Sequence, residues 1–403
     1  MATVLVLGAG IGGISAANSL RKRLGAAHRI VVVDRESQQV FAPSLLWLMV
    51  GQRRPSTIVR PLAQMLVPGV ELIRGDVLRL DPAGRRVETS VGEFTADAIV
   101  IALGADLAPE AMPGYVDAGH NFFTLDGAAR FAEGLARFEG GRLAVAVSSL
   151  PFKCPAAPYE AAFLIDGELR RRGLRERTTL DLYTPEAAPM PVAGPVLGRA
   201  VVELMAARGI GYHAATPIAG YDAGGRRIII ADGSTIAFDL LAAVPPHRPP
   251  AVLAGTGLTN PAGWVVVDSG TLETGVPGVF AIGDTTAIPL ANGKLLPKAG
   301  VFAHAQAAVV ASQIAARLGG GPAETFDGHG YCWVELGASV AGFATGNFYA
   351  TPDPAVTLRR PGRLWHAGKV LFERYWLSRG LMRRLAGLGL RLGSALFGVP
   401  ARL

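Results

Sequence analysis

The sequence predicts an α/β protein with two domains that each contain a parallel sheet, followed by a helical C-terminal region. Three observations lead to this prediction. A glycine-rich segment joins an apolar strand to a helix near the N-terminus, the same layout returns in the middle of the chain, and basic and apolar residues alternate in the last segment. At 403 residues, 50% of them hydrophobic, the chain is long enough for two or three domains with a large core.

The N-terminal motif is that of a dinucleotide site. An apolar strand, a glycine loop, a helix and a second strand that ends in an acid follow one another from the start of the chain. The loop contains Gly8, Gly10 and Gly13, and the acid is Asp34. Gly8 permits a tight turn, Gly10 lets the backbone approach a pyrophosphate, and Gly13 lets the helix pack closely on the strand. Asp34 can bind ribose hydroxyls, so we expect a Rossmann-like domain.

Two later strands lie where a flavin-binding domain of this type needs them. One runs into a turn at Gly104, where the chain can leave the first domain. The other ends at Gly283 and Asp284, whose carboxylate can bind a ribityl chain or cap a helix. We therefore expect the FAD-binding domain to be discontinuous, with residues 1–106 and 263–329.

The middle of the chain, residues 107–262, repeats this layout without the glycine loop. A strand at 142–147 and a helix at 159–171 are joined by residues 148–158, which include prolines and Cys154 but no glycine. Prolines remove amide donors, and side chains keep the backbone away from a pyrophosphate. We expect this second Rossmann-like domain to lack a nicotinamide site.

Only two cysteines occur in the chain, Cys154 and Cys332. Two inert buried thiols are one interpretation of this pair, and a redox-active pair is the other. The sequence has neither the basic start of a secretory signal nor an apolar span of about 18 residues. We therefore expect the chain to stay in the cytoplasm, where a stable disulfide is unusual unless it is catalytic.

Residues 330–403 are expected to open with a hairpin and then to form basic helices. The net charge is +7, and many arginines of the last segment alternate with Leu, Phe and Trp. This pattern favours an anionic lipid surface over nucleic acid. We expect residues 364–403 to lie on a membrane as amphipathic helices; packing on the protein itself and a dimer contact are the alternatives.

Several motifs resemble those of the sulfide:quinone oxidoreductase and flavocytochrome c sulfide dehydrogenase family, a branch of the flavin disulfide reductases. They are Cys-Pro-x-x-Pro-Tyr-Glu at 154–160, Pro-Lys-Ala-Gly-Val-Phe-Ala at 297–303, and Cys332 followed by Glu335. The resemblance covers most of the chain. It departs from the family pattern because no cysteine precedes Cys154, so a third cysteine and a cysteinyl link to the flavin are absent.

The resemblance implies non-covalent FAD in the first domain and a redox pair of Cys154 and Cys332 on one face of the flavin. It also implies a quinone pocket on the other face, near a C-terminus that holds the protein on the cytoplasmic side of the inner or plasma membrane as a monotopic protein. Sulfide would then be the electron donor and a membrane quinone the acceptor, with zero-valent sulfur or polysulfide as the product.

Four further residues are candidates for this chemistry. Glu160 could handle protons for the incoming sulfide, or it could be a surface or capping carboxylate. Lys298 could place a positive charge at the flavin pyrimidine, beside the N-terminus of a helix, or it could be solvated. Phe343 and Phe348 could line the quinone pocket or belong to the core.

Two other functions remain open. A type II NADH:quinone dehydrogenase would share the folds and the C-terminal helices, but it would need a glycine loop where residues 148–158 have none. A non-catalytic flavin-binding redox sensor or assembly partner could use the cysteine pair as a switch. The sequence suggests neither a metal site nor a nucleic-acid partner, and it leaves the oligomeric state undecided.

Overall fold

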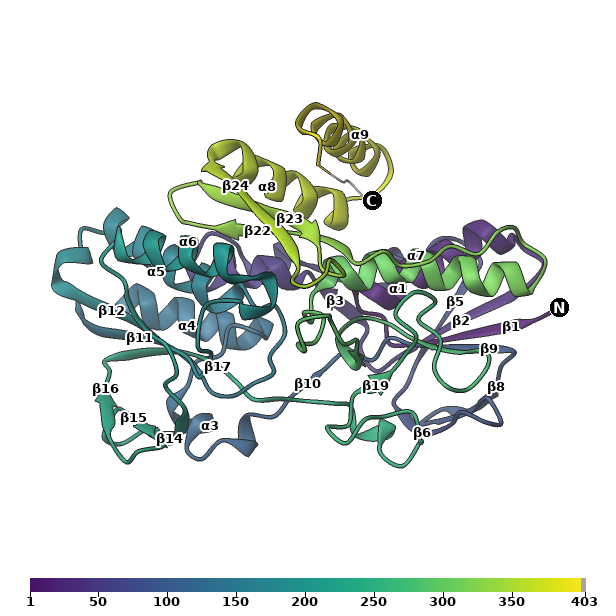
Figure 1. Cartoon of the computed structure of the whole chain (residues 1–403), viewed down its shortest axis with the longest axis horizontal. Coiled ribbons are helices and arrows are strands. Elements are labelled where there is room, and N and C mark those ends of the chain that lie inside the picture. The colour runs from purple at the N-terminus through teal and green to yellow at the C-terminus, as the bar shows by residue number, and fades with distance from the viewer. Residues whose placement is uncertain (400–403) are drawn as a thin grey trace.

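The first sheet is parallel, with four strands from residues 3–101 and a fifth strand from residues 279–281. The computed structural model describes residues 1–399 (Figure 1). The strand order of this sheet is β20-β9-β1-β2-β5, and every neighbouring pair is parallel. The strands are β1 (Thr3–Leu7), β2 (Arg29–Asp34), β5 (Val70–Arg74), β9 (Ala98–Ile101) and β20 (Val279–Ala281). The whole second sheet therefore lies, in sequence, between β9 and its neighbour β20.

Two helices of this part pack against each other, α1 (Ile11–Leu24) and α7 (Gly300–Arg317). Helix α1 starts immediately after the glycine loop. Gly8 has φ +94°, and a Cβ atom on Gly13 would lie 1.8 Å from the Gly8 carbonyl oxygen. The loop therefore needs glycine at both positions, for the turn at the first and for the close approach at the second.

Short elements complete the first domain and link it to the second. Strands β10 (Asp106–Leu107) and β18 (His247–Arg248) pair where the chain crosses between the sheets. The other elements are β3 (Gln38–Val40), α2 (Leu45–Met49), β4 (Val59–Pro61), β6 (Val77–Asp81), β7 (Arg86–Thr89), β8 (Gly92–Thr95), β19 (Val265–Val266) and β21 (Thr286–Ala287).

The second sheet is also parallel, with strand order β13-β12-β11-β17. Its strands are β11 (Gly141–Val147), β12 (Thr178–Tyr183), β13 (Gly211–His213) and β17 (Leu240–Val244). Its helices are α3 (Tyr115–Ala118), α4 (Leu125–Arg137), α5 (Ala157–Arg171) and α6 (Pro195–Ala206), and β14 (Ile218–Asp222), β15 (Arg227–Ile230) and β16 (Thr235–Ala237) form a separate antiparallel sheet. The predicted α/β class with two Rossmann-like sheets is confirmed.

The C-terminal region lies across both domains (Figure 1). Three antiparallel strands, β22 (His329–Glu335), β23 (Ala341–Asn347) and β24 (Ala355–Gly362), precede two helices, α8 (Arg363–Leu377) and α9 (Gly380–Phe397). The predicted hairpin is therefore extended by a third strand. Strand β22 contacts α5 of the second domain and α7 of the first. Within residues 1–399, no helix is long and apolar enough to cross a membrane.

Candidate active site

Cys154 lies in the loop between β11 and α5, at the carboxyl end of a central strand. Its backbone amide donates a hydrogen bond to the Lys298 carbonyl (2.7 Å), and its own carbonyl accepts one from the Ala157 amide (2.8 Å). Its φ of +56° is in the left-handed region, which residues with a side chain rarely adopt. Cys154 is thus held between the first turn of α5 and the segment that leads into α7.

Cys332 lies on β22, and both cysteines line one small cavity of about 70 Å³. The cavity is apolar, and its other walls come from the segment before α7, from the start of α6 and from β23. Both cysteines are free thiols in this structure. Two segments far apart in the sequence therefore bring the predicted pair together at one apolar cavity.

The surroundings of the two thiols favour their protonated form. Burial raises the pKa of Cys154 to about 12, and the negative charge of Glu160 adds to this increase. Burial also raises the pKa of the Cys332 thiol well above its usual value, and Glu160 acts on it in the same direction. The charge of Lys369 lowers the pKa of both thiols. Lys369 is thus the positive charge that can favour a thiolate here.

Glu160 is buried in the first turn of α5, so its interpretation as a surface carboxylate is wrong. Only 2% of the residue is exposed. Its Oε1 atom accepts hydrogen bonds from the Lys369 Nζ (2.7 Å) and from the Glu335 amide (2.7 Å). Lys369 belongs to the segment 364–403 that was expected to lie on a membrane, but its side chain points into the protein: it is 6% exposed and paired with Glu160.

Lys298 is buried as well, so the alternative of a solvated lysine is wrong. Its Nζ donates to the carbonyl oxygens of Asp284 (2.6 Å) and Thr286 (3.1 Å) and lies 3.4 Å from the ring centroid of Trp264. Burial lowers the pKa of Lys298 to about 8. The lysine is therefore fixed beside Asp284, one of the residues predicted to bind the cofactor, and its role toward the flavin stays a prediction.

The residues predicted to hold FAD leave polar groups and space for it. Asp284 Oδ1 is buried without a hydrogen-bond partner in the described part of the chain, as expected of a group that bonds a ribityl hydroxyl. A Cβ atom on Gly10, the N-cap of α1, would meet no atom within 4 Å. The start of α1 is thus open to a pyrophosphate, which helix N-termini bind through their amides.

The other predicted cofactor residues lie around the same sheet edge. The Asp34 carboxylate accepts hydrogen bonds from the amides of Ala9 and Glu36, which orient it at the glycine loop. Gly104 (φ +73°) and Gly283 (φ +72°) follow β9 and β20 with left-handed backbones. These residues fit a dinucleotide that lies along the carboxyl ends of the first sheet.

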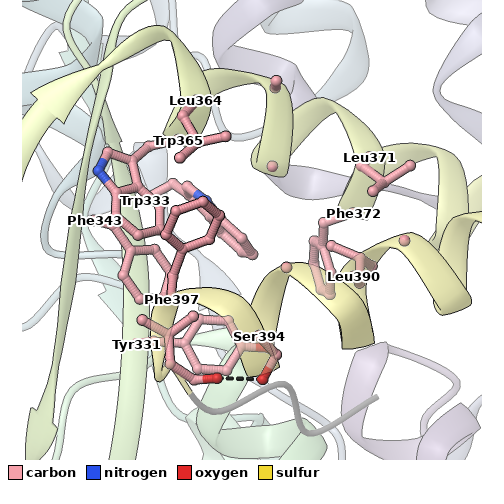
Figure 2. A pocket seen from close by; sticks show the side chains of 15 residues that line it. Tyr331, Trp333, Phe343, Leu364, Trp365, Leu371, Phe372, Leu390, Ser394 and Phe397 are labelled. Atoms are coloured by element: carbon pink, nitrogen blue, oxygen red, sulfur yellow. Dashed lines mark hydrogen bonds between the residues drawn. The ribbon is translucent and has the colours of Figure 1, made fainter.

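A second, larger cavity of about 210 Å³ lies between the C-terminal sheet and helices α8 and α9 (Figure 2). Phe343 stacks on Trp365 there at 4.8 Å between ring centroids, and Trp333 lies edge-on to Phe343 at 5.4 Å. The Trp333 Nε1 atom is buried and has no hydrogen-bond partner among residues 1–399. This aromatic cavity was not predicted. The two aromatic residues at 331 and 333 are two positions apart, a spacing that indicates one apolar face of a strand.

The two cavities lie on opposite faces of the C-terminal sheet. Neighbouring residues of a strand point to opposite faces, so Cys332 faces the small cavity and Trp333 the aromatic cavity. The predicted quinone residues separate in the same way, since Phe343 lines the aromatic cavity and Phe348 the small one. The two phenylalanines therefore do not line one cavity, and their roles toward a quinone stay a prediction.

Comparison with known proteins shows which proteins this chain resembles. The family model described as pyridine nucleotide-disulphide oxidoreductase matches residues 2–149. Mouse mitochondrial sulfide:quinone oxidoreductase is 24% identical over 96% of this chain and 90% of its own length. The sulfide-quinone reductase of Aquifex aeolicus is 27% identical over 93% and 90%. The crystal structure of the Aquifex enzyme superposes with a TM-score of 0.83 at 24% identity, over 93% of this chain and 90% of that one.

Residues 2–149 thus match the model of the pyridine nucleotide-disulphide oxidoreductases, and over most of its length the chain is similar to sulfide:quinone oxidoreductases. FAD is accordingly its cofactor, and the open start of α1 and the unpaired Asp284 oxygen fit that assignment. Relatives named NADH dehydrogenase-like proteins also match, over a smaller share of the chain. Both sulfide and NADH thus appear in the names of proteins that are similar to this flavoprotein.

A second buried carboxylate beside this site gives the flavoprotein a testable pH dependence. Glu186 accepts a hydrogen bond from the Tyr159 hydroxyl (2.6 Å), and burial raises the pKa of Glu186 to about 7. The folded state therefore holds this proton more tightly than the unfolded state. This group's contribution to stability is present at low pH and decreases as the pH rises from about 4.5 to about 7, by up to about 3 kcal/mol.

Glu186→Gln should therefore flatten the decrease in unfolding free energy between about pH 4.5 and about pH 7, as measured by urea unfolding. Glu176→Gln is the matched control, because Glu176 is exposed on the same domain. An equal pH dependence in wild type and Glu186→Gln would contradict the assignment of a buried, proton-holding Glu186.

Proposed function

We propose that this flavoprotein oxidises sulfide through Cys154 and Cys332 and passes the electrons through FAD to a membrane quinone. The observation that carries the proposal is the meeting of the two cysteines of the chain in one small apolar cavity. One of them occupies the loop in which a nicotinamide domain would have its glycines. The similarity to proteins named sulfide:quinone oxidoreductases supports the same conclusion.

The cysteines supply the covalent chemistry. In the oxidised protein they form a disulfide, and HS⁻ attacks one of the two sulfurs, which gives Cys–S–SH and releases the other cysteine as Cys–S⁻. The persulfide and the thiolate then return to the disulfide, with loss of two electrons, one proton and one zero-valent sulfur atom. The sulfur is transferred to an acceptor or extends a polysulfide. When bound, FAD accepts the two electrons and allows them to be passed to a quinone.

Charges around the cavity support this reaction. The thiolate released in the first step is disfavoured by burial and by Glu160, and it is favoured by Lys369. The charge of Glu160 raises the pKa of both thiols, and two hydrogen bonds position its carboxylate. We therefore assign to Glu160 the role of accepting the proton of the incoming sulfide. Lys298 supplies a positive charge that is fixed by its hydrogen bond to the Asp284 carbonyl oxygen. The carbonyl oxygen of Lys298 itself accepts the hydrogen bond from the Cys154 amide, so this charge lies on the segment that holds Cys154.

The aromatic cavity is the proposed quinone pocket. A quinone needs a flat apolar slot and a donor for a carbonyl oxygen, and Trp333 Nε1 is an unpaired donor in an apolar lining. Figure 2 shows Trp333, Phe343 and Trp365 at one end of this cavity and Leu371 and Phe372 at the other. Phe343 is retained as a quinone residue, and Phe348 is not.

Trp333→Phe should raise the KM for decylubiquinone about three- to tenfold, because one hydrogen bond to the carbonyl is lost. The rate of flavin bleaching by sulfide should stay unchanged, because the cysteines lie on the other face of the sheet. Trp365→Phe is the matched control: its indole nitrogen already donates to the Arg360 carbonyl, so the KM should change less. Equal effects of the two substitutions would contradict the donor role of Trp333.

The exposed face of α9 is the proposed membrane contact. Its large apolar side chains stand in solvent, with Leu381 69% and Leu392 62% exposed. Arginines such as Arg383 and Arg391 flank them and suit anionic lipid headgroups. We place the protein as a monotopic, peripheral protein on the cytoplasmic side of the inner or plasma membrane, with the quinone pocket between α9 and the C-terminal sheet.

Steady-state reduction of decylubiquinone by the purified holoprotein tests the proposal. Sulfide should support turnover and NADH should not. Turnover with NADH would favour a type II NADH dehydrogenase. The loop before α5 argues against this function because it contains no glycine. Flavin binding without turnover on either donor would favour a redox sensor or assembly partner.

A further inference from the structure

We propose that four ionisable side chains form a proton path from the cysteine cavity to the surface beside the aromatic cavity. The path consists of Glu160, Lys369, Glu335 and His366. It rests on the proposed function and adds to it the route by which the proton of sulfide leaves the apolar cysteine cavity. Electrons then travel through FAD while protons travel through the C-terminal region.

The inner half of the path is an ion pair with low exposure. Lys369 Nζ lies 2.7 Å from Glu160 Oε1, and the side chains are 7% and 3% exposed. Lys369 is also influenced by the charges of Glu335 and Cys332, both on β22. Glu160 in turn acts on both thiols. Glu160 is therefore the buried carboxylate that we expect to accept a proton released at the sulfurs, and it is already paired with Lys369.

The outer half leads to solvent. The Glu335 amide donates to Glu160, and the Glu335 carboxylate lies 3.0 and 3.2 Å from His366 Nδ1. The Glu335 side chain is 1% exposed, whereas that of His366 is 20% exposed. His366 also faces Trp47 edge-on at 5.8 Å between ring centroids. Three of the four side chains are thus at most 7% exposed, and His366 is the group through which the path reaches solvent.

The end of the path lies on the helix that also lines the proposed quinone pocket. His366 and Lys369 belong to α8, as do Trp365 and Leu371 of the aromatic cavity. The reaction HS⁻ + Q + H⁺ → S⁰ + QH₂ releases one proton at the sulfur and needs two at the quinone. The path delivers the first proton to the side of the sheet where both are consumed, and the second comes from solvent.

A purely structural role is the competing explanation, since a buried ion pair also holds α8 in place. His366→Gln separates the two, because glutamine can still donate a hydrogen bond to Glu335 but cannot carry a proton. Bleaching of the flavin by sulfide, without quinone, should become at least about tenfold slower in this variant. Its solvent deuterium isotope effect should increase, and added imidazole should restore the rate.

Glu335→Gln interrupts the path deeper in the protein, where imidazole cannot reach, so its slower bleaching should not be rescued. His329→Gln is the matched control, because His329 lies exposed on the same strand. FAD content and melting temperature show whether the variants are folded. Wild-type rates and isotope effects in His366→Gln would overturn the proton path, and so would rescue of Glu335→Gln by imidazole. A wild-type flavin that does not respond to sulfide would instead overturn the proposed function, and the path with it.

Discussion

Cys154→Ala and Cys332→Ala should each slow the bleaching of the flavin by sulfide about a thousandfold or more. Each variant lacks one of the two sulfurs between which the disulfide forms, so HS⁻ has no sulfur–sulfur bond to attack. The measurement is anaerobic stopped-flow absorbance of the holoprotein after mixing with sulfide. Both side chains line a cavity rather than a packed core, and alanine keeps the backbone at Cys154, so the fold should be retained.

Two controls make this result specific. The FAD content of both variants should equal that of wild type, because the glycine loop and Asp284 lie on other segments. Dithionite should still bleach the flavin at the wild-type rate, since it does not use the cysteines. Near-wild-type bleaching by sulfide in both single variants would exclude the cysteine pair as the electron relay.

Changing three exposed leucines of α9 to glutamate should lower partitioning onto anionic vesicles at least about a hundredfold. Leu385, Leu388 and Leu392 are 53%, 55% and 62% exposed and stand on one helix face. Burying a leucine contributes about 1.5–3 kcal/mol, and the new carboxylates are repelled by anionic lipid. Sedimentation with phosphatidylglycerol vesicles measures the effect.

The matched control carries the same kind of change on the far side of the molecule. Leu78, Val91 and Val116 are 56%, 58% and 67% exposed on β6, the β7–β8 turn and α3, opposite α9 (Figure 1). Their triple change to glutamate adds the same charge and should leave most of the binding intact. Equal losses in the two triple variants would mean that net charge, and not the α9 face, determines binding.

Surface substitutions are a sharper test than removal of residues 364–403. Three buried side chains of helix α8 bind polar groups elsewhere in the protein: Lys369 binds Glu160, Glu373 binds Arg53 and Ser44, and Trp376 binds Gln39. Deleting it would leave Glu160 buried without its partner, which costs about 3–5 kcal/mol. Loss of membrane binding after such a deletion could then reflect unfolding.

Features that depend on local sequence were predictable. The glycine loop, the strand ends at Gly104 and Asp284, and the parallel sheets follow from short-range spacing, because chain geometry links residues a few positions apart to one turn or one face. The alternation of side chains along a strand would also have placed Phe343 and Phe348 on opposite faces of the sheet, and likewise Cys332 and Trp333. The two residues of each pair are an odd number of positions apart, within a strand or next to its end.

Long-range partners were not predictable in this way. The pairing of Lys369 with Glu160 joins α8 to α5 across 209 positions of the chain. A lysine among apolar residues gives the same local pattern whether it faces lipid or a buried carboxylate. Lys298 shows the same ambiguity. Which helix face packs on the protein is decided by the three-dimensional contacts of the C-terminal sheet, and the sequence of the helix alone does not contain them.

The most direct test of the account is the anaerobic absorbance spectrum of the purified holoprotein after addition of sulfide and, in a separate sample, of NADH. We expect sulfide to bleach the flavin band within the time of mixing. Addition of decylubiquinone should then restore the band. We expect NADH to leave the band unchanged, because the loop before α5 lacks a nicotinamide site. Bleaching by NADH together with no response to sulfide would contradict the account.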